Sequence, residues 1–166
     1  MGTNMPFDGM AGADLLRAAL ADLVARGVTL KACSSVWRTE AWPAGADQPD
    51  YFNAVVEIEA VGWTPPTLYE ALRQIESAFG RERRERWAAR TLDLDIVAMD
   101  GFIGEFDGIQ IPHARMQERA FVLAPLAEIA PDWRHPTLGQ TARELLAAPP
   151  PGDKYEAVAV LALAAG

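Results

Sequence analysis

The segment "RWAARTLDLDIV", residues 86–97, decides the interpretation of the fold, because it sets two aspartates into an apolar, strand-like run. A carboxylate buried alone is energetically costly. Side chains alternate across a strand, so Asp93 and Asp95 share one face and Leu92, Leu94 and Ile96 share the other. The two acids can therefore lie on the open face of a sheet, and we expect them to share a ligand there.

The sequence on both sides of this run predicts an α+β protein. Helical spacing and β-rich runs predict helices over residues 12–27, 64–80, 118–130 and 141–148, and strands over 28–39, 51–61, 91–99 and 154–166. Thr64 is the expected N-cap of the second helix. Helices packed on one face of a mainly antiparallel sheet accommodate this order most economically. We expect one domain spanning residues 1–166.

The composition limits the kinds of partner that we expect this protein to bind. A net charge of −8 over 166 residues argues against bulk binding of nucleic acid. No apolar run has the length of a membrane span, and no signal peptide is visible. Cys33 is the only cysteine, which fits a reducing compartment. We therefore expect a cytoplasmic monomer with small-molecule partners, and with no membrane or nucleic-acid partner.

An arginine-rich segment stands out against this acidic background. Residues 73–90 contain six arginines and three glutamates, which suggests a local anion such as a phosphate ligand. Two neighbouring carboxylates repel each other unless a cation lies between them, and Mg²⁺ prefers oxygen ligands. The alternatives are a solvated, salt-bridged surface for the arginines and a solvent-facing strand for Asp93 and Asp95. Trp87 could stack on a flat heterocycle or anchor its loop.

Three ordered blocks resemble one known family. The quoted run of residues 86–97 closely resembles the signature of the 6-hydroxymethyl-7,8-dihydropterin pyrophosphokinase family. "IPHARMQERAFVLAPLAEIAPD" (residues 111–132) resembles its P-H-x-x-[ML]-x-x-R-x-F-x-L-x-P-L-x-E-I-A-P block. "SSVWRTEAWPAGADQPDYFNAVVEIEA" (residues 34–60) resembles its pterin loop and the following strand. The likeness runs from about residue 2 to residue 133.

The resemblance implies an enzyme of folate biosynthesis. It would transfer the β,γ-diphosphate of ATP to the hydroxymethyl group of the pterin and release AMP. By this likeness two Mg²⁺ ions are held by Asp93 and Asp95, and catalysis depends on Arg81, Arg90, Asp93 and Asp95. The implied pterin-binding residues are Thr39, Tyr51, Asn53, Trp87 and Phe121. The implied nucleotide-binding residues are Glu76, Arg81, Arg83, Arg90, Ile96, His113 and Arg119.

The two ends of the sequence suggest a rearranged sheet. The family opens with an apolar strand that leads into G-[ST]-N, whereas here only Met1 precedes Gly-Thr-Asn at residues 2–4. In a ferredoxin-like sheet that strand is central, and "YEAVAVLALAAG" (residues 155–166) has the apolarity to replace it. One hypothesis is therefore a circular permutation, with residues 155–164 in the central slot and Gly166 near Met1. The alternative is a mis-set start with an unrelated C-terminal tail.

Two rival functions remain at this point. A catalytically silent ligand-binding domain could use the same layers, because fold alone does not fix function. The intact acid pair argues against it. A metal-dependent nuclease would favour a wider basic surface than this acidic chain offers.

Overall fold

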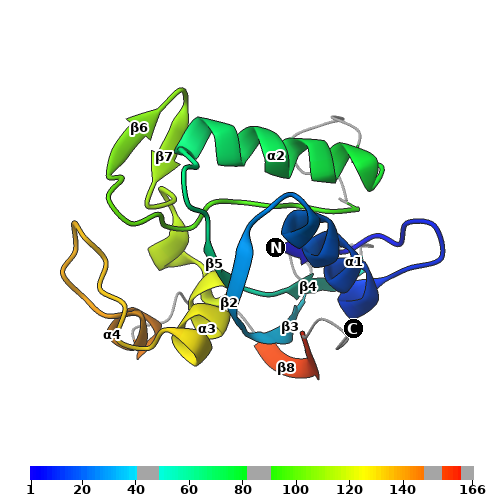
Figure 1. The fold of residues 1–166 in the computed structure, drawn as a ribbon. Coiled ribbons are helices and arrows are strands. Elements are labelled where there is room, and N and C mark those ends of the chain that lie inside the picture. The colour runs from blue at the N-terminus through cyan, green and yellow to red at the C-terminus, as the bar shows by residue number, and fades with distance from the viewer. Residues whose placement is uncertain (41–48, 82–90, 148–154, 162–166) are drawn as a thin grey trace.

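The computed structural model describes residues 1–40, 49–81, 91–147 and 155–161. The described chain forms eight short strands, four α-helices and one 3₁₀ turn (Figure 1). The strands are β1 (Gly2–Thr3), β2 (Thr29–Cys33), β3 (Ser35–Thr39), β4 (Tyr51–Asn53), β5 (Val56–Glu59), β6 (Gly104–Phe106), β7 (Ile109–Ile111) and β8 (Tyr155–Val160). The helices are α1 (Gly12–Ala25), α2 (Pro65–Ala78), α3 (Ala120–Ile129) and α4 (Ala142–Ala147), with a 3₁₀ turn η1 (Met116–Glu118) before α3.

The two long helices form where apolar residues recur at helical spacing. Leu16 and Leu20 lie on the buried face of α1. α2 begins after Thr64, whose backbone N–H donates to Thr67 Oγ1 at 2.8 Å, while the Thr64 side chain accepts from the Thr67 backbone N–H. This reciprocal arrangement satisfies N–H groups that a helix start would otherwise leave without partners. Both predicted helices, and the predicted N-cap at Thr64, are confirmed.

Each of the two long predicted strands is divided into two shorter ones. Residues 28–39 form β2 and β3 with a break at Ser34, and residues 51–61 form β4 and β5. At the break, Ser34 N–H donates to the Val55 carbonyl oxygen at 3.0 Å, and Val55 N–H donates to Ser34 Oγ at 3.0 Å. A side-chain oxygen therefore replaces a carbonyl of the ladder, and β2–β5 and β3–β4 continue as two antiparallel pairs.

The prediction that helices pack on one face of the sheet agrees with α1 and α2 but not with α3. Ala54 and Ile96 belong to the apolar cluster formed with α1 and α2. Their sequence neighbours Val55 and Val97 pack instead against the cluster formed by η1, α3 and α4. Because neighbouring residues of an extended chain point to opposite faces, α3 lies on the face opposite α1 and α2. The one-face prediction is wrong for α3, since these strands are apolar on both faces.

The predicted strand over residues 91–99 keeps its alternation but forms almost no ladder. Leu92, Leu94 and Ile96 are all buried, whereas Asp95 is exposed. Among the described residues, the backbone pairs with Gly2 at Asp93, whose N–H and carbonyl bond to it at 2.8 Å each, and otherwise makes only isolated contacts, between Val97 and His113 and between Met99 and Phe102. The Leu94 N–H donates a hydrogen bond to the side chain of Glu76 on α2 and not to a neighbouring strand. The segment is therefore an extended run and not a regular strand.

The C-terminal strand lies at the edge of its sheet, whose strand order is β1-β4-β3-β8. β8 pairs with β3, and the central place between β4 and Asp93 is occupied by Gly2. The prediction that residues 155–164 fill the central slot is therefore wrong for the described part. Leu161 is buried in the core, and Glu156 forms an ion pair with Arg38 of β3, which together hold β8 at this edge. Gly166 lies outside the described residues.

Candidate active site

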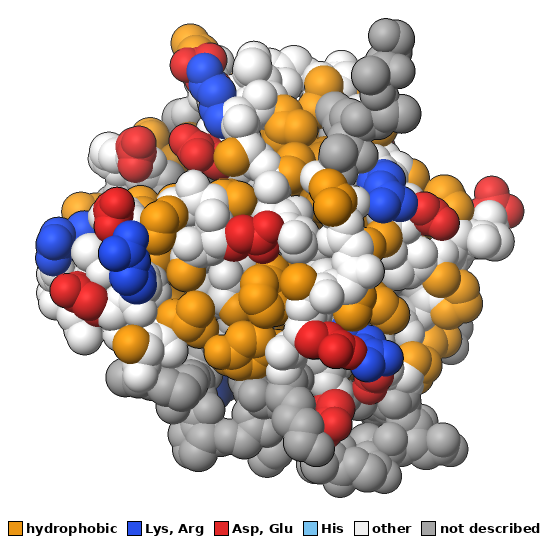
Figure 2. All heavy atoms as spheres, turned by 90° about the horizontal axis from the view of Figure 1, so that it is seen from below, with side chains coloured by type: hydrophobic (Ala, Val, Ile, Leu, Met, Phe, Trp, Pro, Cys, Tyr) orange, Lys and Arg blue, Asp and Glu red, His pale blue; other side chains and the backbone are white. Residues whose placement is uncertain are grey.

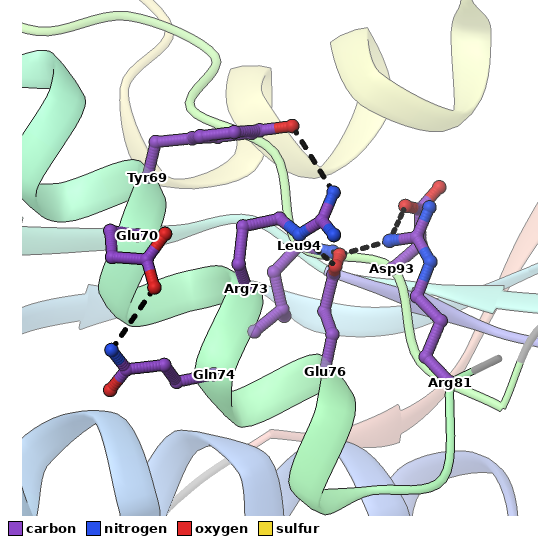
Figure 3. A network of polar contacts seen from close by, with 8 residues as sticks. All are labelled: Tyr69, Glu70, Arg73, Gln74, Glu76, Arg81, Asp93 and Leu94. Atoms are coloured by element: carbon purple, nitrogen blue, oxygen red, sulfur yellow. Dashed lines mark hydrogen bonds and ion pairs between the residues drawn. The ribbon is translucent and has the colours of Figure 1, made fainter. Parts of the chain in front are cut away.

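A buried carboxylate joins α2 to the acidic segment (Figure 3). Glu76, in the last turns of α2, is 2% exposed. Its Oε1 accepts from the Leu94 backbone N–H at 2.7 Å and from the Arg81 guanidinium. Arg81 Nη1 also lies 2.7 Å from Asp93 Oδ1. Glu76 and Arg81 thus fix both the backbone and the first carboxylate of the acidic segment.

Opposing effects act on the charge of the buried Glu76 carboxylate. Burial raises the pKa of Glu76 above its ordinary value, while the Leu94 N–H and the Arg81 guanidinium act in the opposite direction. Among the described residues, no hydrogen-bond donor reaches Glu76 Oε2, and the nearest ion-pair contact is Arg73 Nε at 3.7 Å. Tyr69 receives a long hydrogen bond from Arg73 and lies beneath its guanidinium. Glu76 Oε2 is therefore a buried acceptor atom without a hydrogen-bond donor among the described residues.

The acid pair faces away from the α1–α2 core, as the alternation predicts. The Asp93 side chain is 27% exposed and Asp95 is exposed, whereas Leu94 between them is 3% exposed. Across the described ranges, no group of three or more His, Cys, Asp or Glu residues forms a metal site. The donor chemistry nevertheless fits Mg²⁺, which binds through one or two carboxylates and completes its shell with water and phosphate oxygens.

Three of the expected pterin residues, Thr39, Tyr51 and Asn53, lie on β3 and β4. Gly2 pairs with Asp93 on one side and with Asn53 on the other. Asn53 Nδ2 donates to Thr39 Oγ1 at 3.2 Å, and both residues are buried. Tyr51 is paired in register with Thr39. A Cβ atom at Gly2 would lie 2.8 Å from Asn53 Oδ1, so the glycine leaves room for the Asn53 amide.

Other expected site residues come from the β7–α3 region. His113 N–H donates to the Val97 carbonyl oxygen at 2.8 Å, which ties this region to the end of the acidic segment. Arg119 caps α3, and its guanidinium lies 5.6 Å from the centroid of the Phe121 ring. Ile96 is buried in the core beneath α1 and α2.

The structure therefore brings the expected residues together in two groups. Glu76, Arg81 and Asp93 form one bonded network, and Thr39, Tyr51 and Asn53 adjoin it through Gly2. The expected site residues Arg83, Trp87 and Arg90 lie outside the described residues.

Sequence reasoning missed several residues of this region. Arg73 was indicated only by its spacing of three residues from Glu76, which brings their side chains together on a helix. Gly2 was quoted as part of a motif, but its steric role depends on the Asn53 side chain across the strand pair. Trp37 and Glu128 were also not predicted, because the hydrogen bond between them joins residues that are 91 positions apart in the sequence.

The surface on the side opposite α2 is mixed in character (Figures 1 and 2). Apolar side chains cover much of the middle of this face, and acidic and basic side chains are scattered among and around them. The described atoms of this face show no continuous basic stripe of the kind that a nucleic acid backbone requires. Among the described helices, none is both long enough and apolar enough to cross a bilayer.

This antiparallel α+β fold sets two carboxylates beside an arginine, which supplies the oxygen ligands for a metal ion and the positive charge that enzymes use to transfer phosphoryl or diphosphoryl groups. Residues 1–131 match the family model described as 7,8-dihydro-6-hydroxymethylpterin-pyrophosphokinase. The chain belongs to this family.

Curated relatives agree with the family match, and each is named 2-amino-4-hydroxy-6-hydroxymethyldihydropteridine pyrophosphokinase. The protein from Synechocystis sp. is 45% identical over 134 residues, which cover 80% of this chain and 67% of the relative. The protein from Methylorubrum extorquens is 42% identical over 121 residues, covering 73% of this chain and 74% of the relative. The protein from Pseudomonas aeruginosa is 46% identical over 105 residues, covering 63% and 64%.

Proposed function

We propose that this chain transfers the β,γ-diphosphate of ATP to the hydroxymethyl oxygen of 6-hydroxymethyl-7,8-dihydropterin and releases AMP, a reaction of folate biosynthesis. The observation that carries the proposal is the family match, because residues 1–131 include every proposed site residue. Residues 1–166 act as one domain, since Val55 and Val97, which pack against the second apolar cluster, directly follow Ala54 and Ile96 of the first.

The transfer breaks one phosphorus–oxygen bond and forms another. The pterin hydroxymethyl oxygen attacks the β-phosphorus of ATP, and the bond from that phosphorus to the oxygen bridging toward the α-phosphorus breaks. The hydroxyl proton passes to solvent, and AMP leaves with the bridging oxygen. Negative charge on the transferred group must be neutralised throughout, which is the role of Arg81 and Arg90.

Asp93 and Asp95 are the residues that would hold two Mg²⁺ ions. Bound Mg²⁺ would neutralise phosphate charge and lower the pKa of the hydroxyl that attacks. The chain's own contribution is to keep Asp93 in place, because Arg81 Nη1 lies 2.7 Å from its Oδ1 and Glu76 fixes Leu94 at 2.7 Å.

The two substrates occupy adjoining parts of the site. Asn53 offers both donors and acceptors to a pterin edge, with Thr39 orienting its amide and Tyr51 beside it. Phe121 and Trp87 stack on the flat ring. The proposed nucleotide residues are Arg81, Arg83, Arg90, His113 and Arg119 along the phosphates, with Glu76 and Ile96, both buried in this structure, near the adenine.

The test is a nucleotide assay with ATP, the pterin alcohol and Mg²⁺, in which AMP, ADP and ATP are separated chromatographically. Pterin-dependent formation of AMP supports the proposal. ADP as the product, or no turnover, contradicts it and favours a silent binding domain. The Asp95→Asn variant should lose AMP formation, whereas Asp100→Asn is the matched control, because Asp100 is exposed and lies beyond the proposed site.

A further inference from the structure

The indole of Trp37 on β3 is held by a carboxylate from α3. Trp37 Nε1 donates to Glu128 Oε2 at 2.9 Å. The other oxygen of Glu128 accepts from the Ser35 backbone N–H at 2.9 Å and from Ser35 Oγ at 2.8 Å. Burial alone would raise the pKa of Glu128, but these hydrogen bonds hold its pKa below the ordinary value. The ionised carboxylate therefore binds α3 to β3 at Ser35 and Trp37.

A second element contacts the same indole. The ring of Tyr155, at the start of β8, lies 5.7 Å from the Trp37 ring, with an interplanar angle of 53°. Tyr155 is paired in register with Thr39, one of the proposed pterin residues. Tilted aromatic pairs at this separation are favourable. Trp37 is thus held from α3 on one side and from β8 on another.

Trp37 lies directly beside the proposed pterin pocket. It is paired in register with Asn53 across the β3–β4 pair. Trp37 and Thr39 are two residues apart on one strand, so their side chains share a face. Asn53 in turn bonds to Thr39 at 3.2 Å. Directly opposed side chains on an antiparallel pair are in contact range, so the position of the indole determines the space left for the Asn53 amide.

We propose that Trp37 is a positioning residue for the pterin pocket, fixed by Glu128 and Tyr155, and that it holds Asn53 and Thr39 at the spacing the pterin edge requires. This inference rests on the proposed function, because it needs Asn53 and Thr39 to bind the pterin. Trp37 does not itself take part in the chemistry. Its loss should therefore weaken pterin binding much more than it changes nucleotide binding or the chemical step.

The test compares substrate constants in the full chain. Trp37→Phe removes the indole N–H but keeps an aromatic ring, and Glu128→Gln removes the charge but keeps one acceptor oxygen. Each variant should raise the KM for the pterin about tenfold, while kcat and the KM for ATP stay within about twofold of the wild type. Tyr155→Ala, which acts from the other side, should also raise the pterin KM. Asp132→Asn is the control, because this exposed acid on the loop after α3 pairs only with Arg143 among the described residues.

The double variant Trp37→Phe with Glu128→Gln separates positioning from general loss of stability. If the two residues act through their shared hydrogen bond, the combined effect on the pterin KM should be clearly smaller than the product of the single effects. Unchanged pterin constants in all three single variants overturn the inference. So does an equal rise of both KM values together with a matching drop in melting temperature, because that pattern indicates a purely structural link.

Failure of the proposed function has a different signature. If the wild-type chain forms no AMP with the pterin alcohol, the proposed function fails, whatever the variants do. If the wild type is active and the Trp37 and Glu128 variants match it in every constant, only the positioning role fails.

Discussion

Replacing Glu76 by alanine should destabilise the protein far more than replacing it by glutamine. Glu76 is 2% exposed, and its Oε1 is the acceptor for the Leu94 N–H and for Arg81. Alanine removes both bonds. Glutamine keeps an oxygen that can accept from Leu94 and removes only the charge.

The magnitude follows from these contacts. A buried N–H left without an acceptor costs about 1–3 kcal/mol, and a lost charge-assisted hydrogen bond costs about 1.5–3 kcal/mol. Arg81 keeps Asp93 as a partner, and the burial cost of the Glu76 charge disappears, so the lower ends of these ranges apply. Glu76→Ala should therefore lose roughly 3 kcal/mol of unfolding free energy, and Glu76→Gln about 1 kcal/mol or less. At about 2–4 °C per kcal/mol for a chain of this size, alanine should lower the melting temperature by about 6–12 °C.

Urea unfolding at several pH values tests both the size of these losses of unfolding free energy and the direction in which they change with pH. The pKa of Glu76 is raised in the folded state, so the folded protein holds this proton to a higher pH than the unfolded chain does. This group's contribution to stability therefore falls as the pH rises through its folded pKa. The wild type should gain stability relative to Glu76→Gln as the pH is lowered through that value. Equal stabilities of the alanine and glutamine variants, or a difference between wild type and glutamine that does not change with pH, would refute this reasoning.

The remaining predictions concern single positions. Asp95→Asn should nearly abolish turnover while leaving the melting temperature unchanged, because Asp95 is exposed; near-normal activity with Mg²⁺ would remove it from the metal pair. Gly2→Ala should raise the pterin KM, because the new Cβ would lie 2.8 Å from Asn53 Oδ1; an unchanged KM would show that the Asn53 amide has room to move. Burial lowers the pKa of His135, so unfolding free energy should fall as the pH drops below the ordinary histidine range, and His135→Asn should lack that slope in urea titrations.

The sequence predicted the faces on which the side chains of the acidic segment lie better than it predicted the segment's secondary structure. Alternation alone placed Asp93 and Asp95 opposite Leu92 and Leu94, because a period of two survives in any extended chain. The missing ladder could not be predicted, since the Leu94 N–H bonds to Glu76, a side chain 18 residues away. Local patterns carry no information about such a partner.

The wrong predictions for the positions of β8 and α3 also arise from contacts between residues that are distant in the sequence. The apolarity of residues 155–160 correctly predicted a strand. It could not predict the neighbouring strand, because any free edge of the sheet can pair with such a segment, and in the structure β8 pairs with β3. The position of α3 depends on which face of the strands it covers. The apolar residues of α3 indicate that this helix is buried. Its place in the fold is shown only by Val55 and Val97, which pack against its apolar cluster from the second face. Strand neighbours and helix faces are set by packing across the whole chain, which local sequence patterns do not report.

The most direct measurement follows the phosphorus atoms of ATP. With wild-type protein, the pterin alcohol, Mg²⁺ and ATP labelled at the β-phosphorus, all of the transferred label should appear in the pterin product, and the nucleotide product should be unlabelled AMP. Label that stays in ADP, or label that reaches inorganic phosphate without a labelled pterin, would contradict diphosphate transfer by this chain.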